Sequence, residues 1–320
     1  MKAIVYTRYG SPDVLEFNDV PMPVPTDNEV LVKVRAASVN PLDWHLMRGE
    51  PQFLRLIFGL RKPKDTRLGV DAAGLVEAVG KNVTQFKPGD EVFGACHGAF
   101  AEFARATEDQ LVPKPVNVSF EQAAAAPIAA ITALQGLRDK GHIKPGQNVL
   151  VDGASGGVGT FAVQIAKSFG TEVTAVCSTR NVEKARCIGA DRVIDYTRED
   201  FTRNGQHYDL ILGANAYHSI FDYRRALTQK GICVKAGGRI SIAAMLLAPL
   251  VALVLSLFSS KRTCGFVAKL NKSDLEILKD LLEAGKIVPV IDRRYPLSDA
   301  VQAVRYLEEG HAQGKVVLTF

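Results

Sequence analysis

The sequence predicts a two-domain α/β protein, in which a β-rich domain accompanies a doubly wound parallel sheet. Short strand-like segments, separated by proline and glycine, fill the first third of the chain. From about residue 121, strand-like and helix-like segments alternate, which is typical of a parallel sheet wrapped by helices. At residues 152–161, DGASGGVGTF, a glycine-rich bend joins an apolar strand to an amphipathic helix.

The composition is that of a chain with a large core. Its 320 residues are 47% hydrophobic, which is enough for two domains. The 39 basic and 34 acidic residues are mostly interspersed, so we expect attraction of small anions and no nucleic-acid partner. The five cysteines show no C-x-x-C spacing and the N-terminus lacks a signal-peptide pattern, so we expect reduced thiols and a cytoplasmic protein.

Both ends of the chain contribute to the first predicted domain. Residues 29–39, 74–80 and 90–94 alternate or are β-branched, as strands are. The tail adds two helices and a closing strand, KVVLTF, and we expect it to return to this domain. The first domain is therefore predicted to comprise residues 1–123 and 273–320.

The middle of the chain forms the second predicted domain, residues 124–272. Residues 121–137 have a helical composition, and residues 158–170 carry apolar side chains at helical spacing. A further helix is predicted at 181–189. Strands are predicted at 172–178, 192–196, 208–214, 231–237 and 264–270, after the strand that enters the glycine bend.

Two apolar segments have two interpretations each. Residues 240–258 are nearly long enough to span a bilayer, but Pro249 interrupts them. We expect a buried helix, or a wall of a pocket or subunit contact, with membrane contact as the alternative. Residues 51–68 mix apolar and basic side chains and predict a lid or pocket wall, with a basic amphipathic membrane surface as the alternative.

The glycine bend predicts a dinucleotide site, because strand, glycine turn and helix follow one another in the required order. Glycines let the backbone approach a pyrophosphate, and the helix N-terminus offers unpaired N–H groups. A purely structural tight turn is the alternative. The predicted pyrophosphate contacts are Ser155, Gly156, Gly157 and Val158.

The end of the next strand predicts NADPH as the dinucleotide. An NAD site usually places an acid there for the ribose 2′-OH, whereas this strand ends Cys177-Ser178-Thr179-Arg180-Asn181. Ser178 and Arg180 would offer a hydroxyl and a positive charge to a 2′-phosphate. A solvated Arg180 at a helix start is the alternative.

Several motifs together carry a family resemblance that runs essentially from end to end. They are Val39-Asn40-Pro41-Leu42-Asp43, Gly69-Val70-Asp71-Ala72-Ala73-Gly74, Lys87-Pro88-Gly89-Asp90, Ala130-Ile131-Thr132-Ala133, the glycine bend and Gly310-His311-Ala312-Gln313-Gly314-Lys315. The chain resembles the medium-chain dehydrogenase/reductase superfamily, and within it the zinc-free quinone oxidoreductase branch. The resemblance implies a GroES-like catalytic domain, a Rossmann domain and NADP(H) as cofactor.

The resemblance also directs the candidate site residues. Catalytic roles are predicted for Asn40, Asp43 and Thr132, with helix capping (Asn40, Asp43) and ordinary helix packing (Thr132) as alternatives. Further cofactor contacts are predicted at Tyr196, Gly213, Ala236, Gly237, Phe266, His311 and Lys315.

Departures from the zinc alcohol dehydrogenases predict the reaction. Those relatives carry a cysteine where this chain has Asn40, and a His-Glu pair where it has Val70-Asp71, so we expect no metal. Without a Lewis acid, a quinone or an α,β-unsaturated carbonyl is the expected substrate, because conjugation spreads the developing negative charge. The alternative is an NADPH-binding interaction or membrane-associated protein with little turnover. A homodimer is expected, through an edge strand at 264–269 and the apolar residues 243–258.

Overall fold

The computed structural model describes residues 1–237 and 260–320, so the predicted apolar run 240–258 lies outside the described residues. The chain divides into two compact units. The first comprises Met1–Ala129, Leu270–Gly285 and Pro289–Phe320, and the second comprises Ala130–Lys269 and Lys286–Val288. The domain bounds predicted from the sequence, 1–123 with 273–320 and 124–272, stay a prediction.

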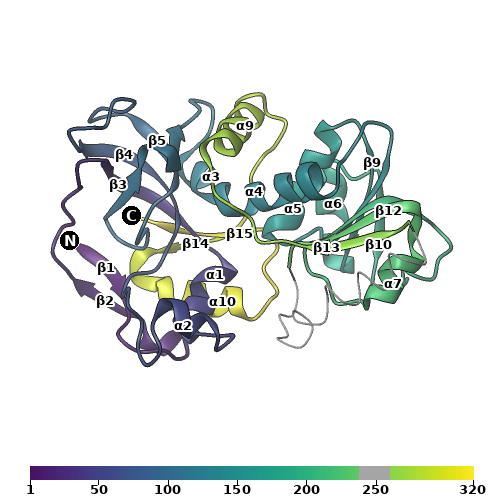
Figure 1. Cartoon of the computed structure of the whole chain (residues 1–320), viewed down its shortest axis with the longest axis horizontal. Coiled ribbons are helices and arrows are strands. Elements are labelled where there is room, and N and C mark those ends of the chain that lie inside the picture. Colours follow the sequence, from purple (N-terminus) through teal and green to yellow (C-terminus); the bar gives the residue numbers. More distant parts are fainter. Residues whose placement is uncertain (238–259) are drawn as a thin grey trace. The chain divides into compact units, whose positions relative to one another are not determined.

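The first unit is built on a mostly antiparallel sheet with the strand order β14-β15-β3-β4-β5-β7, in which β6 also pairs with β3 (Figure 1). A separate antiparallel pair joins β1 to β2. The strands are β1 (Lys2–Val5), β2 (Glu16–Asp19), β3 (Glu29–Val39), β4 (Asp71–Val79), β5 (Glu91–Ala95), β6 (Phe103–Thr107), β7 (Leu111–Pro113), β14 (Ile291–Pro296) and β15 (Lys315–Thr319).

Strand β3 organises this sheet, because it pairs with β4, β6 and β15. Its valines at 30, 32 and 34 point to one face and are buried in the core, as the period of two in a strand requires. The predicted strand 29–39 is confirmed. The helices of this unit are α1 (Pro41–Arg48), α2 (Leu54–Phe58), α3 (Phe120–Ala125), α9 (Lys272–Glu283) and α10 (Ala300–Glu308).

The second unit contains a parallel sheet with the strand order β10-β9-β8-β11-β12-β13. In chain order this is 3-2-1-4-5-6, the order of a dinucleotide-binding fold, so the predicted doubly wound sheet is confirmed. The strands are β8 (Asn148–Asp152), β9 (Glu172–Cys177), β10 (Arg192–Asp195), β11 (Tyr208–Gly213), β12 (Leu227–Lys235) and β13 (Arg262–Gly265). Helices α5 (Gly157–Ser168), α6 (Val182–Cys187) and α7 (Ile220–Arg225) pack on these strands (Figure 1).

Three expectations for the elements were wrong in detail. The single helix predicted at 121–137 is divided into α3 and α4 (Pro127–Gln135), because Pro127 has no N–H to continue the hydrogen-bond ladder. The strand predicted at 264–270 ends at Gly265 and begins at Arg262, where β12 provides its register. Strand β14 was not predicted, because it has no alternating buried face and its place in the sheet depends on pairing with β15.

Within residues 1–237 and 260–320, none of the helices has the length and apolar character needed to cross a bilayer.

The glycine bend owes its shape to one positive φ angle and one close approach of backbone. Gly153 has φ 81°, which is a conformation that favours glycine. A Cβ on Gly159 would lie 2.1 Å from the carbonyl oxygen of Gly153, so the first turn of α5 contacts the bend directly. A Cβ on Gly156 would meet only that same oxygen, at 3.6 Å, which is an ordinary contact.

Replacing Gly159 by alanine should therefore destabilise the protein. Alanine gains about 1 kcal/mol over glycine in a helix interior, but overpacking against backbone costs roughly 1–3 kcal/mol and more when the backbone cannot move. We expect a net loss of about 2 kcal/mol in the free energy of unfolding, measured with urea. Gly156→Ala is the matched control; because alanine is less favourable than glycine at this N-cap, a smaller loss of at most about 1 kcal/mol is expected. Equal stability of the two variants would contradict the packing argument.

Candidate functional site

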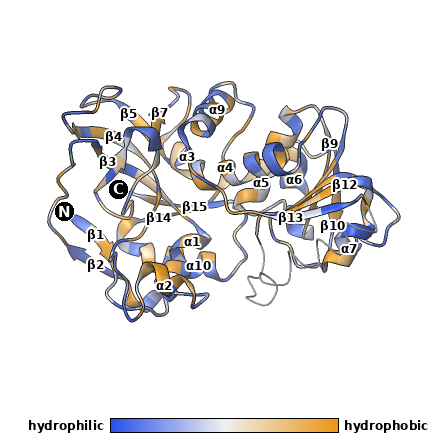
Figure 2. Ribbon diagram, viewed as in Figure 1, coloured by the Kyte–Doolittle hydropathy of each residue, from blue (hydrophilic) through white to orange (hydrophobic). Residues whose placement is uncertain are grey.

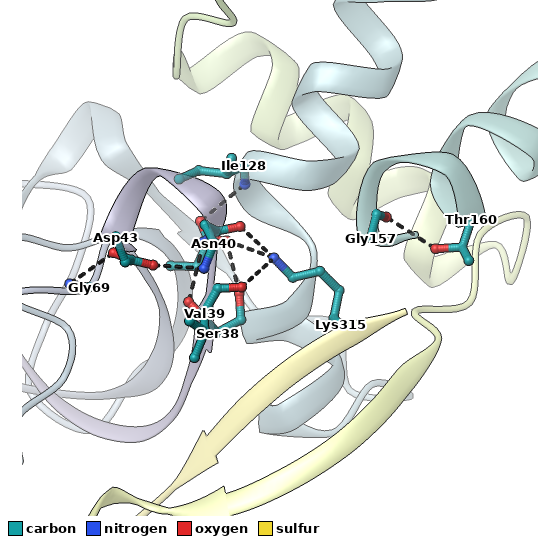
Figure 3. A network of polar contacts seen from close by, with 10 residues as sticks. Ser38, Val39, Asn40, Asp43, Gly69, Ile128, Gly157, Thr160 and Lys315 are labelled. Carbon is teal, nitrogen blue, oxygen red and sulfur yellow. Dashed lines mark hydrogen bonds and ion pairs between the residues drawn. The ribbon is translucent and has the colours of Figure 1, made fainter. Parts of the chain in front are cut away.

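A buried polar network occupies one end of the sheet in the first unit (Figure 3). Its side chains are Ser38, Asn40, Asp43, Asp71 and Lys315, all of them buried. The register of β3 brings them together. Ser38 pairs with Asp71 on β4, and Val39 pairs with Val316, the residue after Lys315.

The amide of Asn40 is held on both sides. Its Oδ1 accepts a hydrogen bond from the Lys315 ammonium at 2.5 Å, and its Nδ2 donates to Asp71 Oδ2 at 2.8 Å and to the Ser38 carbonyl at 3.3 Å. Because lysine only donates and a carboxylate accepts, these partners fix which end of the amide is oxygen. Both amide hydrogens are then committed. Only the second lone pair of Oδ1 is left for a ligand.

Asp43 closes the N-terminus of α1. Its Oδ2 accepts from the Asn40 backbone N–H at 2.7 Å, and its Oδ1 accepts from the Gly69 N–H at 3.2 Å. This is the predicted acid at the third helical position after an N-cap, with Pro41 at the first. The Asn40 side chain is part of the polar network in addition to its N-cap position. Burial raises the pKa of Asp43 to about 7, against the opposing effect of its backbone hydrogen bonds.

Asp71 and Lys315 form the charged centre of the network. Asp71 Oδ2 lies 3.7 Å from the Lys315 Nζ and also accepts from the Ser38 hydroxyl at 2.9 Å. Its Oδ1 accepts from the Ile128 N–H at 3.0 Å. Burial raises the pKa of Asp71 and lowers that of Lys315, while their mutual attraction opposes both changes. Sequence reasoning missed a polar role for Asp71 and Ser38, because only the strand register places them opposite each other.

In the second unit, the N-terminus of α5 presents the predicted pyrophosphate contacts. The first intrahelical backbone bond is donated by Thr160 to the Gly156 carbonyl, at 3.0 Å. The N–H groups of Gly157, Val158 and Gly159 precede it and have no acceptor within the helix. Ser155 stands just before, in the bend, and the Thr160 hydroxyl bonds the Gly157 carbonyl at 3.1 Å (Figure 3). Backbone donors at a helix start, beside glycines without side chains, fit the pyrophosphate of a dinucleotide.

The carboxyl ends of β8, β11 and β12 meet beside this helix start. Ala214 donates its backbone N–H to the Asp152 carbonyl at 2.9 Å, and Ala236 donates to the Gly213 carbonyl at 2.9 Å. Gly237 donates to the same carbonyl at 3.3 Å. The predicted contacts Gly213, Ala236 and Gly237 are thus brought together at the point where the strand order reverses, which is where such sheets bind ligands.

A buried pair of a carboxyl and a phenol, next to the bend, was not predicted. The Tyr223 hydroxyl donates to Asp152 Oδ2, and both side chains are buried. Burial raises the pKa of Asp152, and it also raises that of Tyr223, where the neighbouring carboxylate adds to the effect. The alternation of strands and helices carries no signal for this pair, because the partner lies on α7.

The end of β9 has an acidic neighbour that the linear sequence does not reveal. Asp195 of β10 is in register with Cys177 and accepts from the Thr179 hydroxyl at 2.5 Å and from the Thr197 N–H at 3.0 Å. These bonds hold the pKa of Asp195 below its usual range. Ser178 accepts from the Asn181 side chain at 3.2 Å, and Arg180 is exposed.

The other predicted site residues lie in different surroundings. Tyr196 follows β10 and is exposed. Thr132 is buried in α4, and Phe266 lies just after β13, against the backbone of Gly136. His311 is exposed in the turn after α10. No ligand contact follows from these placements, so their roles stay predictions.

Within residues 1–237 and 260–320, no three His, Cys, Asp or Glu side chains gather in an arrangement that could hold a metal ion.

Known proteins resemble the chain in both units. Residues 26–116 match the alcohol dehydrogenase GroES-like domain family, and residues 188–318 match a zinc-binding dehydrogenase family. The 2-methylene-furan-3-one reductase of Solanum lycopersicum is 36% identical, over 99% of this chain and 79% of that protein. The chloroplast envelope quinone oxidoreductase homolog of Arabidopsis thaliana is 35% identical, over 99% of this chain and 98% of that protein.

The fold comparison agrees with the sequence comparison. The Escherichia coli quinone oxidoreductase, solved in complex with NADPH, superposes with a TM-score of 0.82 and 26% identity, over all of both chains. Sequence identity runs from end to end of the chain, and the fold matches over the whole chain as well. The chain belongs to the medium-chain dehydrogenase/reductase superfamily, among its quinone oxidoreductases and enone reductases.

Proposed function

We propose that this protein is an NADPH-dependent reductase that transfers hydride to quinones or α,β-unsaturated carbonyls. One observation carries the proposal, namely the N–H groups at the start of α5 that have no acceptor within the helix, beside a glycine bend. They occur in a chain whose relatives are named as a quinone oxidoreductase homolog and a methylene-furanone reductase. A methylene-furanone contains a carbon–carbon double bond conjugated to a ketone, so both names describe conjugated electron acceptors.

NADP(H) is the cofactor, and the residues of the second unit fit it. The N–H groups of Gly157 and Val158 would bind the pyrophosphate, and Gly156 leaves space for its approach. NADPH, when bound, supplies the hydride. Ser178 and Arg180 would hold the 2′-phosphate, while Asp195 is turned toward Thr179 and Thr197 by its hydrogen bonds. The other predicted contacts at Tyr196, Phe266 and His311 are part of the same proposal.

The polar network of the first unit would fix the geometry of Asn40. The remaining lone pair of its Oδ1 can accept one hydrogen bond, from a carboxamide N–H or a hydroxyl. Its Nδ2 cannot donate to a substrate oxygen without leaving Asp71 or Ser38. Asn40 would therefore orient a ligand by accepting a hydrogen bond from it. The hydrogen bond to the substrate oxygen would come from another group. Asp43 supports this arrangement from the N-terminus of α1, and Thr132 remains a candidate for the nicotinamide region.

Zinc independence is part of the proposal, although one matched family is described as zinc-binding. Asn40 replaces a thiolate with an amide that already has partners on both sides. Asp71 accepts from three uncharged donors and lies beside a lysine, which would have to be displaced or neutralised before a dication could bind. A conjugated acceptor suits such a site, because its oxygen needs hydrogen bonds more than a Lewis acid.

A homodimer in the cytoplasm is also proposed. Strand β13 lies at the edge of the parallel sheet and pairs with β12 on one side, so its other edge can pair with a second copy.

Purified protein should reduce quinones and enones with NADPH, and it should leave unconjugated ketones and simple alcohols almost untouched. The reason is that conjugation delocalises the charge that a metal would otherwise stabilise. The measurement is NADPH oxidation at saturating cofactor over a panel of these compounds, before and after treatment with a chelator. Loss of activity to the chelator, with about one zinc per chain by metal analysis, would refute zinc independence. Binding of NADPH without turnover of any acceptor would favour the interaction role instead.

Arg180→Ala should weaken NADPH binding by about tenfold or more and leave NADH binding nearly unchanged. Charge-assisted hydrogen bonds contribute roughly 1.5–3 kcal/mol, and only the 2′-phosphate would use this side chain. Isothermal titration with both cofactors measures the effect. Arg186→Ala is the matched control, since that arginine lies on α6 and pairs with Glu183 at 2.5 Å. Equal losses for both cofactors would assign Arg180 to the fold, and equal wild-type affinities would refute the preference.

Lys315→Met should destabilise the protein by about 3–5 kcal/mol, because it leaves Asp71 as an unpaired buried charge. The double variant Lys315→Met/Asp71→Asn should recover part of that loss, since no charge then remains unpaired at this position. Urea unfolding of the two single variants and the double variant gives the coupling energy. Additive effects of the two substitutions would show that the 3.7 Å pair does not act as a unit.

A further inference from the structure

An exposed apolar protrusion follows α1 in the first unit. It consists of residues 54–64, which contain the short helix α2, and we call it the α2 segment. Its large apolar side chains are Leu56, Ile57, Phe58 and Leu60, with exposed fractions of 72%, 61%, 41% and 67%. Other exposed apolar residues, such as Val116 and Val267, stand singly in the sequence, as is normal on protein surfaces. Four exposed apolar side chains within five positions form a patch, and such patches mark interaction surfaces.

The α2 segment is held in place by polar contacts on its inner side. Arg55 donates to the carbonyls of Arg48 and Gly49, at 3.1 and 3.0 Å, and its guanidinium lies over the Tyr9 ring. The Tyr9 hydroxyl donates to the Gly59 carbonyl at 2.6 Å. The segment is thus anchored through one arginine and one tyrosine, and its apolar side chains are left outside. Figure 2 shows apolar residues in α2, beside hydrophilic residues in the loop that follows it.

Positive charge flanks the exposed apolar side chains. Arg61, Lys62 and Lys64 follow directly and are all exposed. In the described part of the chain none of the three has a carboxylate partner, although Lys64 also bonds the Ile57 carbonyl at 3.2 Å. The nearest acids in the sequence are Glu50 and Asp65, and Asp65 is already bound to His97.

We propose that the α2 segment docks the protein on an anionic lipid surface. Apolar side chains that enter the interface, with lysine and arginine at the headgroups, are the recognised pattern for such binding. A second copy of the chain fits less well, because a two-fold contact would place these cations against each other. A partner helix fits less well too, since α2 has only five residues and is too short to offer a partner an extended helical face. The net charge of +5 also favours attraction to an anionic surface.

Sedimentation of the full-length protein with vesicles tests the proposal. Vesicles of phosphatidylcholine and phosphatidylglycerol in equal parts should bind the protein, and added salt should release it. Vesicles of phosphatidylcholine alone should bind far less. Absence of binding to the mixed vesicles at low salt would overturn the proposal, whatever the catalytic activity.

Two variants separate the charged and the apolar contributions. The triple variant Arg61→Gln/Lys62→Gln/Lys64→Gln should lower the partition coefficient by about fivefold for each charge removed. The double variant Leu56→Gln/Leu60→Gln keeps every charge and should lower it by about tenfold. The matched controls are Lys33→Gln/Lys87→Gln/Lys286→Gln for charge and Val24→Gln/Val116→Gln for exposed apolar surface. Controls that lose as much binding as the α2 variants would show non-specific attraction and overturn the proposal.

Turnover of a water-soluble quinone and the oligomeric state are followed in parallel. Both should stay unchanged in the two α2 variants, because lipid docking takes the place of the lid or pocket wall that the sequence predicts for residues 51–68. Variants that lose turnover but keep vesicle binding would make the segment part of the substrate site. Variants that bind vesicles normally but dissociate an oligomer in light scattering would make it a contact between copies. Either result would overturn the lipid assignment.

Discussion

A lysine and two aspartates are buried together in the first unit, and each ion removed from water costs several kcal/mol unless it finds partners. Asp71 and Lys315 meet this requirement through each other and through Asn40. Lys315 and Asn40 are 275 residues apart along the chain, so the pair can form only if the C-terminal strand pairs with β3. The register of β3 against β4 and β15, the start of α1 and the orientation of the Asn40 amide all depend on this charge balance.

A different constraint acts in the second unit, where the backbone of the glycine bend and the first turn of α5 come into close contact. Gly159 lies against the Gly153 carbonyl, and Gly156 and Gly157 carry no side chains where α5 begins. Behind the bend, Asp152 and Tyr223 form a buried hydrogen bond that links β8 to α7. The glycine bend is thus supported by a buried polar pair, just as Asp43 supports the start of α1. In both units, a helix N-terminus near the candidate site is set by buried polar groups and not by apolar packing alone.

Helix α1 connects the two proposals made for the first unit. It begins at Asn40 and Asp43, within the polar network, and ends at Gly49, whose carbonyl accepts from Arg55 of the α2 segment. A reductase of conjugated carbonyls or quinones acts on compounds that partition into lipid when they carry apolar substituents. A lipid-docking surface at the far end of α1 would bring the protein to such compounds.

The sequence alone determined the fold class, the glycine bend, the family and the cofactor, because these depend on local periodicity and on short motifs. The α1 cap was also predictable, since Asn40, Pro41 and Asp43 are neighbours in the chain. Tertiary structure alone revealed that Asn40 bonds Lys315 and Asp71, that Asp195 stands beside Thr179, and that Asp152 bonds Tyr223. These contacts join residues on different strands and helices, and strand order and register decide which of them meet. Residue patterns along a chain carry no record of that pairing, so the chemistry of the buried network could be read only from the folded protein.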